Sequence, residues 1–281
     1  MILANFNIAH VGVICFLASY LAAFVLEVSR LLGRSRASRA IMLLFAVAGF
    51  AAHTTYLVVR SRAADLPPLV GSQQDWMLVL AWLMVLFYLI VTVLDDTSAL
   101  GIFVLPLVLL VIAATYLMSP TPKPLLEEQH HLKMMQSSLL VSGIAGVVIG
   151  CVLGMMYLVQ HRRLKRKHAQ ASGLTMPSLA RLARWNRLAV MFSFPLLTAG
   201  MLTGVGLGLY SQRTAEPVPF RDPVIIGYGL MWLVMAVLFG WLLRVKPSAG
   251  KQVAWMTIWG CGFLLLTVVG LQVLNMDSWH S

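Results

Sequence analysis

Residues 138–167 read SLLVSGIAGVVIGCVLGMMYLVQHRRLKRK, an apolar run followed by a dense basic segment. The apolar part, residues 138–159, contains no charged residue and is long enough to cross the hydrocarbon core, which takes about 20 helical residues. The basic part stays at one surface of the bilayer, because lysine and arginine are costly within it. This stretch therefore predicts a membrane-spanning α-helix that ends in a charged segment.

Seven further apolar runs have similar length. They lie at residues 8–28, 41–59, 77–94, 100–118, 188–209, 224–243 and 253–273. The chain is 59% hydrophobic and only 11% charged, whereas soluble domains carry about 25% charged residues. We therefore predict an all-α fold, a polytopic membrane bundle of eight transmembrane helices that forms a single integral membrane domain over residues 1–281.

The distribution of basic residues predicts the orientation of this bundle. If the N-terminus lies outside, the inner connections hold 15 lysines and arginines and the outer segments hold 6. The positive-inside rule then places both termini on the outer side. Because the net charge of +11 follows the connections between helices, it does not predict nucleic acid as a partner.

Five of the seven histidines collect toward the outer side in this topology. His10, His130, His131 and His280 flank helix ends, and His53 lies inside the second helix, roughly 9 Å below the surface at 1.5 Å per residue. His53 is the only strongly polar side chain that we recognise within a span. Two roles stay open for it, a hydrogen bond to a neighbouring helix and ligation of a cofactor.

Two ligands fit clustered outer histidines. Haem iron takes one or two axial imidazoles in an apolar pocket, and Arg213 and Arg221 either pair with its propionates or face water. Zinc needs three or four ligands, and Glu127 and Glu128 would have to complete the set. Aromatic residues near the outer side either line such a pocket or form an interfacial belt: Trp76, Tyr116, Tyr210, Phe220 and Trp279.

Small residues within the spans indicate close helix packing. The fifth and sixth helices each carry three glycines at a spacing of four: Gly146, Gly150 and Gly154, and Gly200, Gly204 and Gly208. The cysteines all fall inside apolar runs and are expected to act as small apolar filler: Cys15, Cys151 and Cys261. The sequence contains no nucleophile motif, phosphate-binding loop or HExxH pattern, so it gives no positive indication of an enzyme.

The second half of the chain resembles the cytochrome c assembly protein family of the CcmC/CcsA/HemX type. The resemblance is carried by a basic LKRK run at Leu164–Lys167, a PSL segment at Pro177–Leu179, and a helix of the form F-P-L-L-T-x-G-x-x-x-G at Phe194–Gly204. It is strongest over residues 130–281. Weaker support comes from His53 and from DWMLVLAWLMVLFYL at residues 75–89.

The resemblance implies where haem would bind. Haem-handling members of the family hold haem at the outer face through two histidines that flank a tryptophan-rich loop. The first corresponds to His130 or His131, depending on the register chosen, and the second to His280 beside Trp279. In the loop itself Asp222 is kept, but the tryptophans ahead of it are absent, so the chain resembles a divergent, HemX-like or YpjD-like branch.

The function implied by the resemblance is binding or handling of haem b at the periplasmic face of the bacterial inner membrane, in support of cytochrome c biogenesis or haem homeostasis. Expected partners are haem, membrane lipid and proteins of cytochrome c assembly or haem synthesis. The alternative is a non-catalytic scaffold or regulator of such a complex, without haem. A transporter ranks last, because we find no internal repeat and only His53 as a strongly polar candidate within a span.

Overall fold

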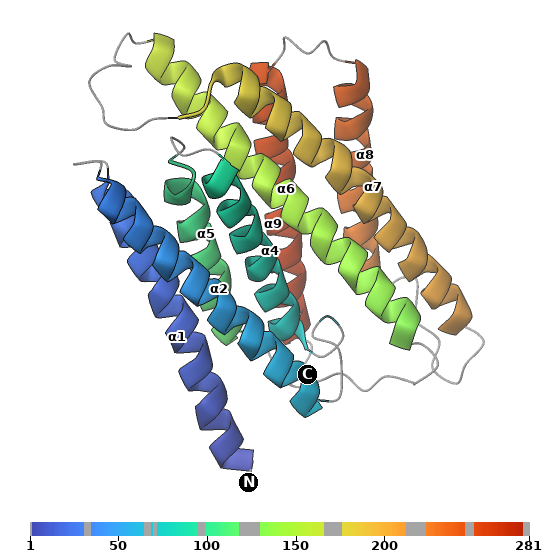
Figure 1. Cartoon of the computed structure of the whole chain (residues 1–281). Helices are drawn as coiled ribbons and strands as arrows, with labels where there is room; N and C mark the ends of the chain where they lie inside the picture. Colours follow the sequence, from blue (N-terminus) through green and yellow to red (C-terminus); the bar gives the residue numbers. More distant parts are fainter. Residues whose placement is uncertain are drawn as a thin grey trace. The chain divides into compact units, whose positions relative to one another are not determined.

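The computed structural model describes residues 2–30, 35–64, 69, 72–94, 99–117, 130–165, 176–211, 223–244 and 250–277. Within these ranges the fold is all-α, with eight α-helices and one short 3-10 helix (Figure 1). In chain order they are α1 (Ile2–Ser29), α2 (Arg36–Ala64), α4 (Gln73–Leu94), α5 (Gly101–Ala114), η1 (Thr115–Leu117), α6 (His130–Lys165), α7 (Leu179–Ser211), α8 (Pro223–Arg244) and α9 (Gly250–Asp277). All eight predicted apolar runs are therefore helical.

Several helices are longer than the apolar runs that predicted them. The helix α7 begins at Leu179 rather than near residue 188, because Ser178 caps its N-terminus. The Ser178 Oγ accepts a hydrogen bond from the backbone N–H of Arg181 at 3.3 Å, and its carbonyl accepts one from Leu182 at 3.0 Å. The basic first turns of α7 thus belong to the helix and not to a loop.

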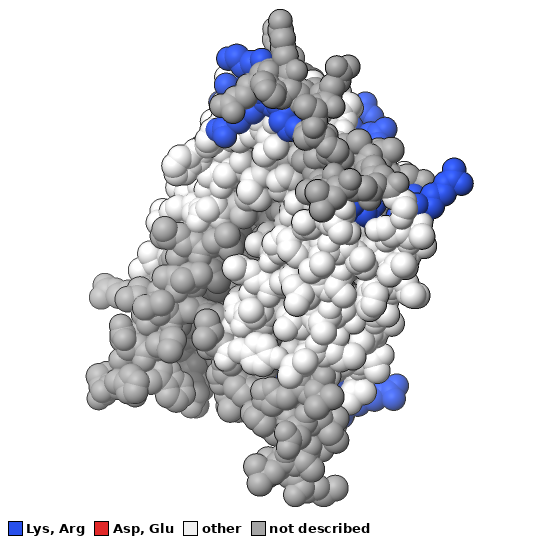
Figure 2. Space-filling model, turned by 90° about the vertical axis from the view of Figure 1, so that its left-hand side faces the viewer, with Lys and Arg blue, Asp and Glu red and all other residues white. Residues whose placement is uncertain are grey.

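Five stretches of the described helices are long and apolar enough to cross a membrane. They are Gly12–Ser29, Arg36–Ala63, Gln74–Leu94, His131–Lys165 and Leu179–Leu209. The helix α5 is apolar but has only 14 residues. In the face drawn in Figure 2, the lysine and arginine side chains lie toward the ends of the view, and a broad band of uncharged residues lies between them. The chain is therefore a membrane protein with several spans.

The chain divides into two compact units, and the first contains α1, α2, α4, α5 and η1. Its helices pair as α1 with α2, α4 with α5, α1 with α5, and α2 with α4. Glycines allow α1 and α2 to approach closely: a Cβ on Gly12 would lie 2.8 Å from the ring of Tyr56, and one on Gly49 would lie 2.8 Å from the ring of Tyr20.

The second unit contains α6 up to His161 together with α7, α8 and α9. Gly143 and Gly146 of α6 face Leu197 and Ser193 of α7, and Gly200 of α7 faces Leu140 of α6. These contacts show that α6 and α7 are antiparallel, because residues later in α6 face residues earlier in α7. The two helices lie side by side in Figure 1. The close packing predicted from the glycine spacing is confirmed.

A third helix packs on another side of α6. A Cβ on Gly150 would meet Thr257 of α9 at 3.1 Å, and one on Gly154 would meet the carbonyl oxygen of Ala254 at 3.1 Å. Gly250, the first residue of α9, lies against the hydroxyl of Tyr157. The helices α6 and α9 are therefore antiparallel neighbours, with their backbones brought together by glycine.

We predict that an alanine at Gly200 destabilises the protein, whereas an alanine at Gly206 of the same helix does not. A Cβ at position 200 would lie 2.8 Å from Leu140 Cγ and 3.1 Å from the Leu140 backbone nitrogen, while position 206 has no atom within 4 Å. Overpacking costs about 1–3 kcal/mol, and alanine in an open helix position is neutral or favourable. Thermal unfolding of both variants in detergent measures the difference, and equal melting temperatures would contradict the packing.

Candidate functional site

His53 lies at the centre of the first unit and its side chain is completely buried. Its ring stacks on Phe16 of α1 with a centroid distance of 4.3 Å and an interplanar angle of 5°. The Tyr20 hydroxyl, also from α1, lies 3.3 Å from His53 Nδ1. Two residues of one helix thus fix both the plane and the rotation of the imidazole on its neighbour.

The second ring nitrogen of His53, Nε2, is buried and has no hydrogen-bond partner among the described residues. If the Tyr20 oxygen accepts the proton of Nδ1, Nε2 keeps a lone pair that is free to bind a metal. Ligating histidines commonly have their other nitrogen held in this way. The donor chemistry of His53 therefore fits an axial ligand of haem iron, and it supplies one imidazole.

A buried ion pair joins α2 to α4 two turns beyond His53. The Arg60 guanidinium pairs with the Asp75 carboxylate through Nε and Oδ1 at 2.5 Å. It also donates to the Tyr56 hydroxyl at 2.9 Å and to Gln74 Oε1 at 3.0 Å. The Ser72 hydroxyl donates to Asp75 Oδ2 at 2.8 Å. This network links the C-terminal part of α2, the helix that carries His53, to the start of α4.

A second buried ion pair lies at the C-terminal end of α1, near the C-terminal half of α4. Arg30 Nη1 donates to Glu27 Oε2 at 2.9 Å, and the Glu27 side chain is 2% exposed. Arg30 and the hydroxyl of Tyr88 each lie 3.6 Å from the sulfur of Met42. The prediction that His53 is the only strongly polar residue inside a span was wrong, because Glu27 lies within residues 8–28. The arginine three residues later was the available sequence signal.

The structure describes the predicted outer ligands only in part. His131 is exposed in the first turn of α6. His130 begins that helix, but its side chain lies outside the described part, as does that of His10 in α1. Five further predicted site residues lie outside the described residues altogether: Arg213, Arg221, Asp222, Trp279 and His280.

The zinc alternative has no support within the described part of the chain. There, no three histidine, cysteine, aspartate or glutamate side chains gather into a group that could hold a metal ion. Glu127 and Glu128, which zinc would need, lie outside the described residues. Among the described histidines, His53 is the one with a buried ring nitrogen that has no hydrogen-bond partner in the described part of the chain.

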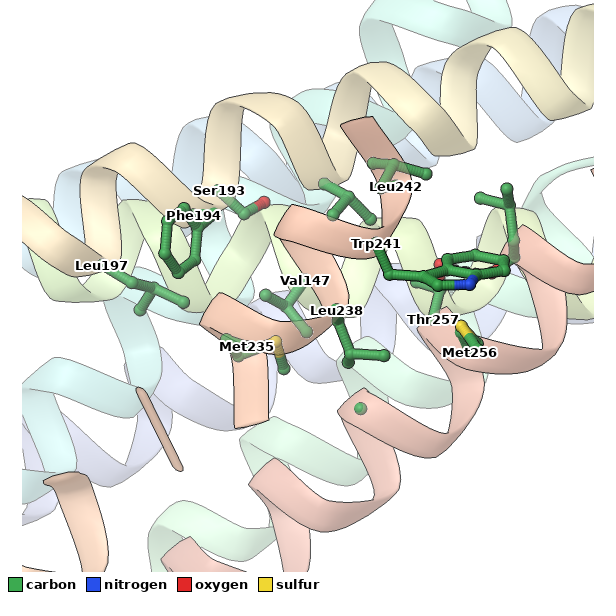
Figure 3. Close-up of a pocket in the computed structure, with 13 residues that line it drawn as sticks. Val147, Ser193, Phe194, Leu197, Met235, Leu238, Trp241, Leu242, Met256 and Thr257 are labelled. Atoms are coloured by element: carbon green, nitrogen blue, oxygen red, sulfur yellow. Dashed lines mark hydrogen bonds between the residues drawn. The ribbon is translucent and has the colours of Figure 1, made fainter. Parts of the chain in front are cut away.

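The second unit contains an apolar cavity of about 30 Å³ between α7, α8 and α9, with Val147 of α6 at one side (Figure 3). Phe194, Met235 and Trp241 form much of its wall. Ser193 and Thr257 border it, but each hydroxyl already donates to a carbonyl of its own helix. A cavity of this size has room for about one water molecule and is too small for a haem.

Asn186 of α7 also has buried polar atoms without a hydrogen-bond partner among the described residues. Its side chain is 1% exposed, and neither its amide nitrogen nor its amide oxygen has a partner among the described residues. It lies where α6, α7 and α9 meet, with its oxygen 3.4 Å from the position of a Cβ on Gly150. Sequence analysis missed it, because the apolar run appeared to begin after it.

Two of the three cysteines meet in the second unit. Cys151 in α6 and Cys261 in α9 lie close enough for each thiol to influence the other. Both are free thiols, and Cys261 is buried. The sequence does not indicate this contact, since the two residues lie on separate helices far apart in the chain.

The profile of one protein family, "Cytochrome C assembly protein", matches residues 70–277, which is most of the chain. The chain belongs to the cytochrome c assembly protein family. The resemblance inferred from the LKRK, PSL and FPLLT segments is thereby confirmed. The matched region includes His130 and His131, begins after His53 and ends three residues before His280.

The fold of this family member is similar to a solved structure, "Cytochrome c Heme Lyase CcmF", with a TM-score of 0.57 at 16% sequence identity. The match covers 95% of this chain but 51% of that protein, so the chain spans about half the length of that protein. At this identity the likeness establishes a shared fold. No curated protein matches the chain in sequence.

We predict that Asp75→Leu lowers the stability of the first unit by about 2–3 kcal/mol, because it leaves the partly buried Arg60 without its counter-charge. The double variant Arg60→Met/Asp75→Leu should recover part of this loss, since no uncompensated charge remains. Arg62→Ala, at an exposed position two residues away, is the control and should unfold as the wild type does. Thermal melts of the four proteins test this, and a neutral Asp75→Leu would contradict a stabilising pair.

Proposed function

We propose that this protein binds haem b at the outer face of a bacterial inner membrane and takes part in cytochrome c biogenesis. Membership of the cytochrome c assembly family carries the proposal, because it makes cytochrome c assembly the process that the chain serves. The distribution of imidazoles on one side of the predicted topology supports haem as the ligand. The similarity to a haem lyase fold adds to this support.

The proposed ligands come from the beginning and the end of the sequence that forms the second unit. His130 or His131, at the start of α6, supplies one imidazole, and His280, beyond α9, supplies the other. Because α6 and α9 are antiparallel neighbours, the beginning of one helix and the end of the other lie toward the same side of the unit. We propose that Arg213 and Arg221 pair with the propionates and that Asp222 and Trp279 contribute to the same site.

Bound haem would supply a redox-active iron and an apolar macrocycle at this face. The proposed role of the protein is to hold the haem. The histidines ligate the iron, the arginines neutralise the propionates, and the apolar helix ends exclude water. His53 is proposed as a ligand of a second, deeper site or as an internal hydrogen-bonding group. His53 Nε2 has no hydrogen-bond partner among the described residues, which favours the role as a ligand. The contact of Nδ1 with the Tyr20 hydroxyl is compatible with either role.

We propose further that the chain is a single integral membrane domain of eight spans with both termini in the periplasm. The excess of basic residues in the connections assigned to the inner side supports this orientation. Single cysteines introduced at positions 131 and 280 of a cysteine-free chain should react with a membrane-impermeant maleimide added to intact cells with a permeabilised outer membrane. A cysteine at position 163, in the basic C-terminal turns of α6, is the control and should react only after lysis. Labelling of 131 and 280 from opposite sides would overturn the ligand set.

We predict that the purified protein, supplied with haem, shows a Soret band that the variants His280→Ala and His130→Ala/His131→Ala lose or shift. The single variants of residues 130 and 131 identify the ligand, because only one imidazole of the pair is needed. His53→Phe is the matched test of the deeper site, since phenylalanine preserves the stacking on Phe16. A wild-type protein that takes up no haem would contradict the proposal.

A scaffold without haem is the second candidate, and the sequence of the outer loop favours it. The segment YSQRTAEPVPFRD at residues 210–222 keeps Asp222 but lacks the tryptophans that precede it in haem-handling relatives. Purification from mildly solubilised membranes separates the two. A protein partner recovered in stoichiometric amount, together with the absence of a Soret band, supports the scaffold.

A further inference from the structure

The helix α7 presents two faces of opposite character to its surroundings. One face is buried, with Leu182, Asn186, Ser193 and Leu197 at helical spacing, and it packs on the rest of the second unit. The other face is exposed. It begins with two basic residues and continues with apolar ones: Arg181, Arg184, Leu188, Phe192 and Pro195. Spacings of three and four residues keep this exposed set on a single stripe of the helix.

The two arginines lie at the end of the unit where its basic residues gather. The antiparallel register with α6 sets Leu182 level with Tyr157, and Tyr157 also contacts Gly250 at the start of α9. Arg181 and Arg184 are therefore level with the first turns of α9. The described basic residues at this end of the unit, which we call the basic end, are Arg181, Arg184, Arg187, Arg244 and Lys251.

Most basic residues in the described helices of this unit lie at the basic end, whereas the acidic residue of these helices, Asp277, lies at the opposite end of α9. Tryptophans accompany the arginines at the same level: the guanidinium of Arg181 lies 5.9 Å from the ring centre of Trp185, and Trp255 is 39% exposed. Arginine beside tryptophan is typical of the boundary between headgroups and acyl chains.

We propose that the exposed stripe of α7 is a binding site for an anionic phospholipid. The guanidinium groups of Arg181 and Arg184 bind the headgroup phosphate, because arginine offers several donors to phosphate oxygens and keeps its charge. Leu188 and Phe192, which are 41% and 67% exposed, receive the acyl chains directly below. The contact of Arg181 with Trp185 holds the first guanidinium at this level and leaves its charge in place.

An anionic lipid fits this stripe better than the other ligands that a basic surface attracts. Inorganic phosphate would use the guanidinium groups but not the apolar stripe below them. A zwitterionic lipid would use the apolar stripe but carries no net charge to complement the basic end. The site serves to anchor and orient the unit in the membrane, and it does not depend on haem.

The test measures lipid adducts of the full-length protein by native mass spectrometry, in detergent, with phosphatidylglycerol or phosphatidylcholine added at equal concentrations. Phosphatidylglycerol should bind several-fold more tightly. Each arginine near a membrane surface contributes about fivefold to the affinity for anionic lipid, so Arg184→Gln should weaken phosphatidylglycerol about fivefold and Arg181→Gln/Arg184→Gln further. Neither variant should change phosphatidylcholine binding.

Two controls separate this site from general charge effects. Arg62→Gln removes an exposed arginine at the end of α2 and should leave both lipids unaffected. Phe192→Ser removes apolar surface from the stripe and should weaken both lipids. For the wild type alone, raising the salt concentration tenfold should weaken phosphatidylglycerol but not phosphatidylcholine, since screening acts on the charged headgroup only.

Three results would overturn the proposal. They are equal binding of the two lipids by the wild type, unchanged phosphatidylglycerol binding by the double arginine variant, and complete displacement of phosphatidylglycerol by millimolar inorganic phosphate. The last result would mean that the arginines hold an anion without using the stripe. Because the substituted side chains are exposed, the variants should unfold at the temperature of the wild type, and the salt comparison remains decisive if one does not.

Discussion

The close approach of α6 to α7 and α9 is the contact on which the second unit depends. Within a bilayer, apolar helices gain little from excluding water, so they associate where their backbones can come near enough for extensive van der Waals contact. Glycines on two sides of α6 permit this: Gly143 and Gly146 face α7, and Gly150 and Gly154 face α9. The same packing brings the start of α6 toward the end of α9, where the proposed haem ligands belong.

Polar groups buried between apolar helices show a consistent pattern in both units. Glu27 and Asp75 each have an arginine beside them, which offsets much of the cost of burying a charge. His53 and Asn186 are different, because they are neutral, no ion pair stabilises them, and each has a buried polar atom without a hydrogen-bond partner among the described residues. Such an atom is costly in an apolar surrounding and is retained where a water, a ligand or a metal satisfies it. Among the described histidines, His53 is the one with such an atom, and it is the histidine proposed above as a ligand or as an internal hydrogen-bonding group.

Membership of the cytochrome c assembly family supports a role in cytochrome c biogenesis. Two surfaces of the protein are proposed to contribute to that role. The proposed haem site lies where α6 begins, at the side predicted to face the periplasm. The basic end lies at the opposite end of α6, where arginines and tryptophans mark a membrane boundary. A protein that handles a large apolar cofactor at one boundary needs its helices fixed relative to the bilayer, and a lipid held at the other boundary would contribute to this.

The sequence by itself determined the eight helices, the family and the packing faces of α6 and α7, because hydropathy, basic clusters and glycine spacing act through neighbouring residues on one helix. It misplaced the start of α7, since a serine cap and a basic first turn extend a helix beyond its apolar run. Only the tertiary structure decided which distant groups meet. It placed Cys151 near Cys261, held His53 against Phe16 and Tyr20, and buried Asn186 without a hydrogen-bond partner among the described residues. These pairings depend on the rotation and register of separate helices, which no local pattern fixes.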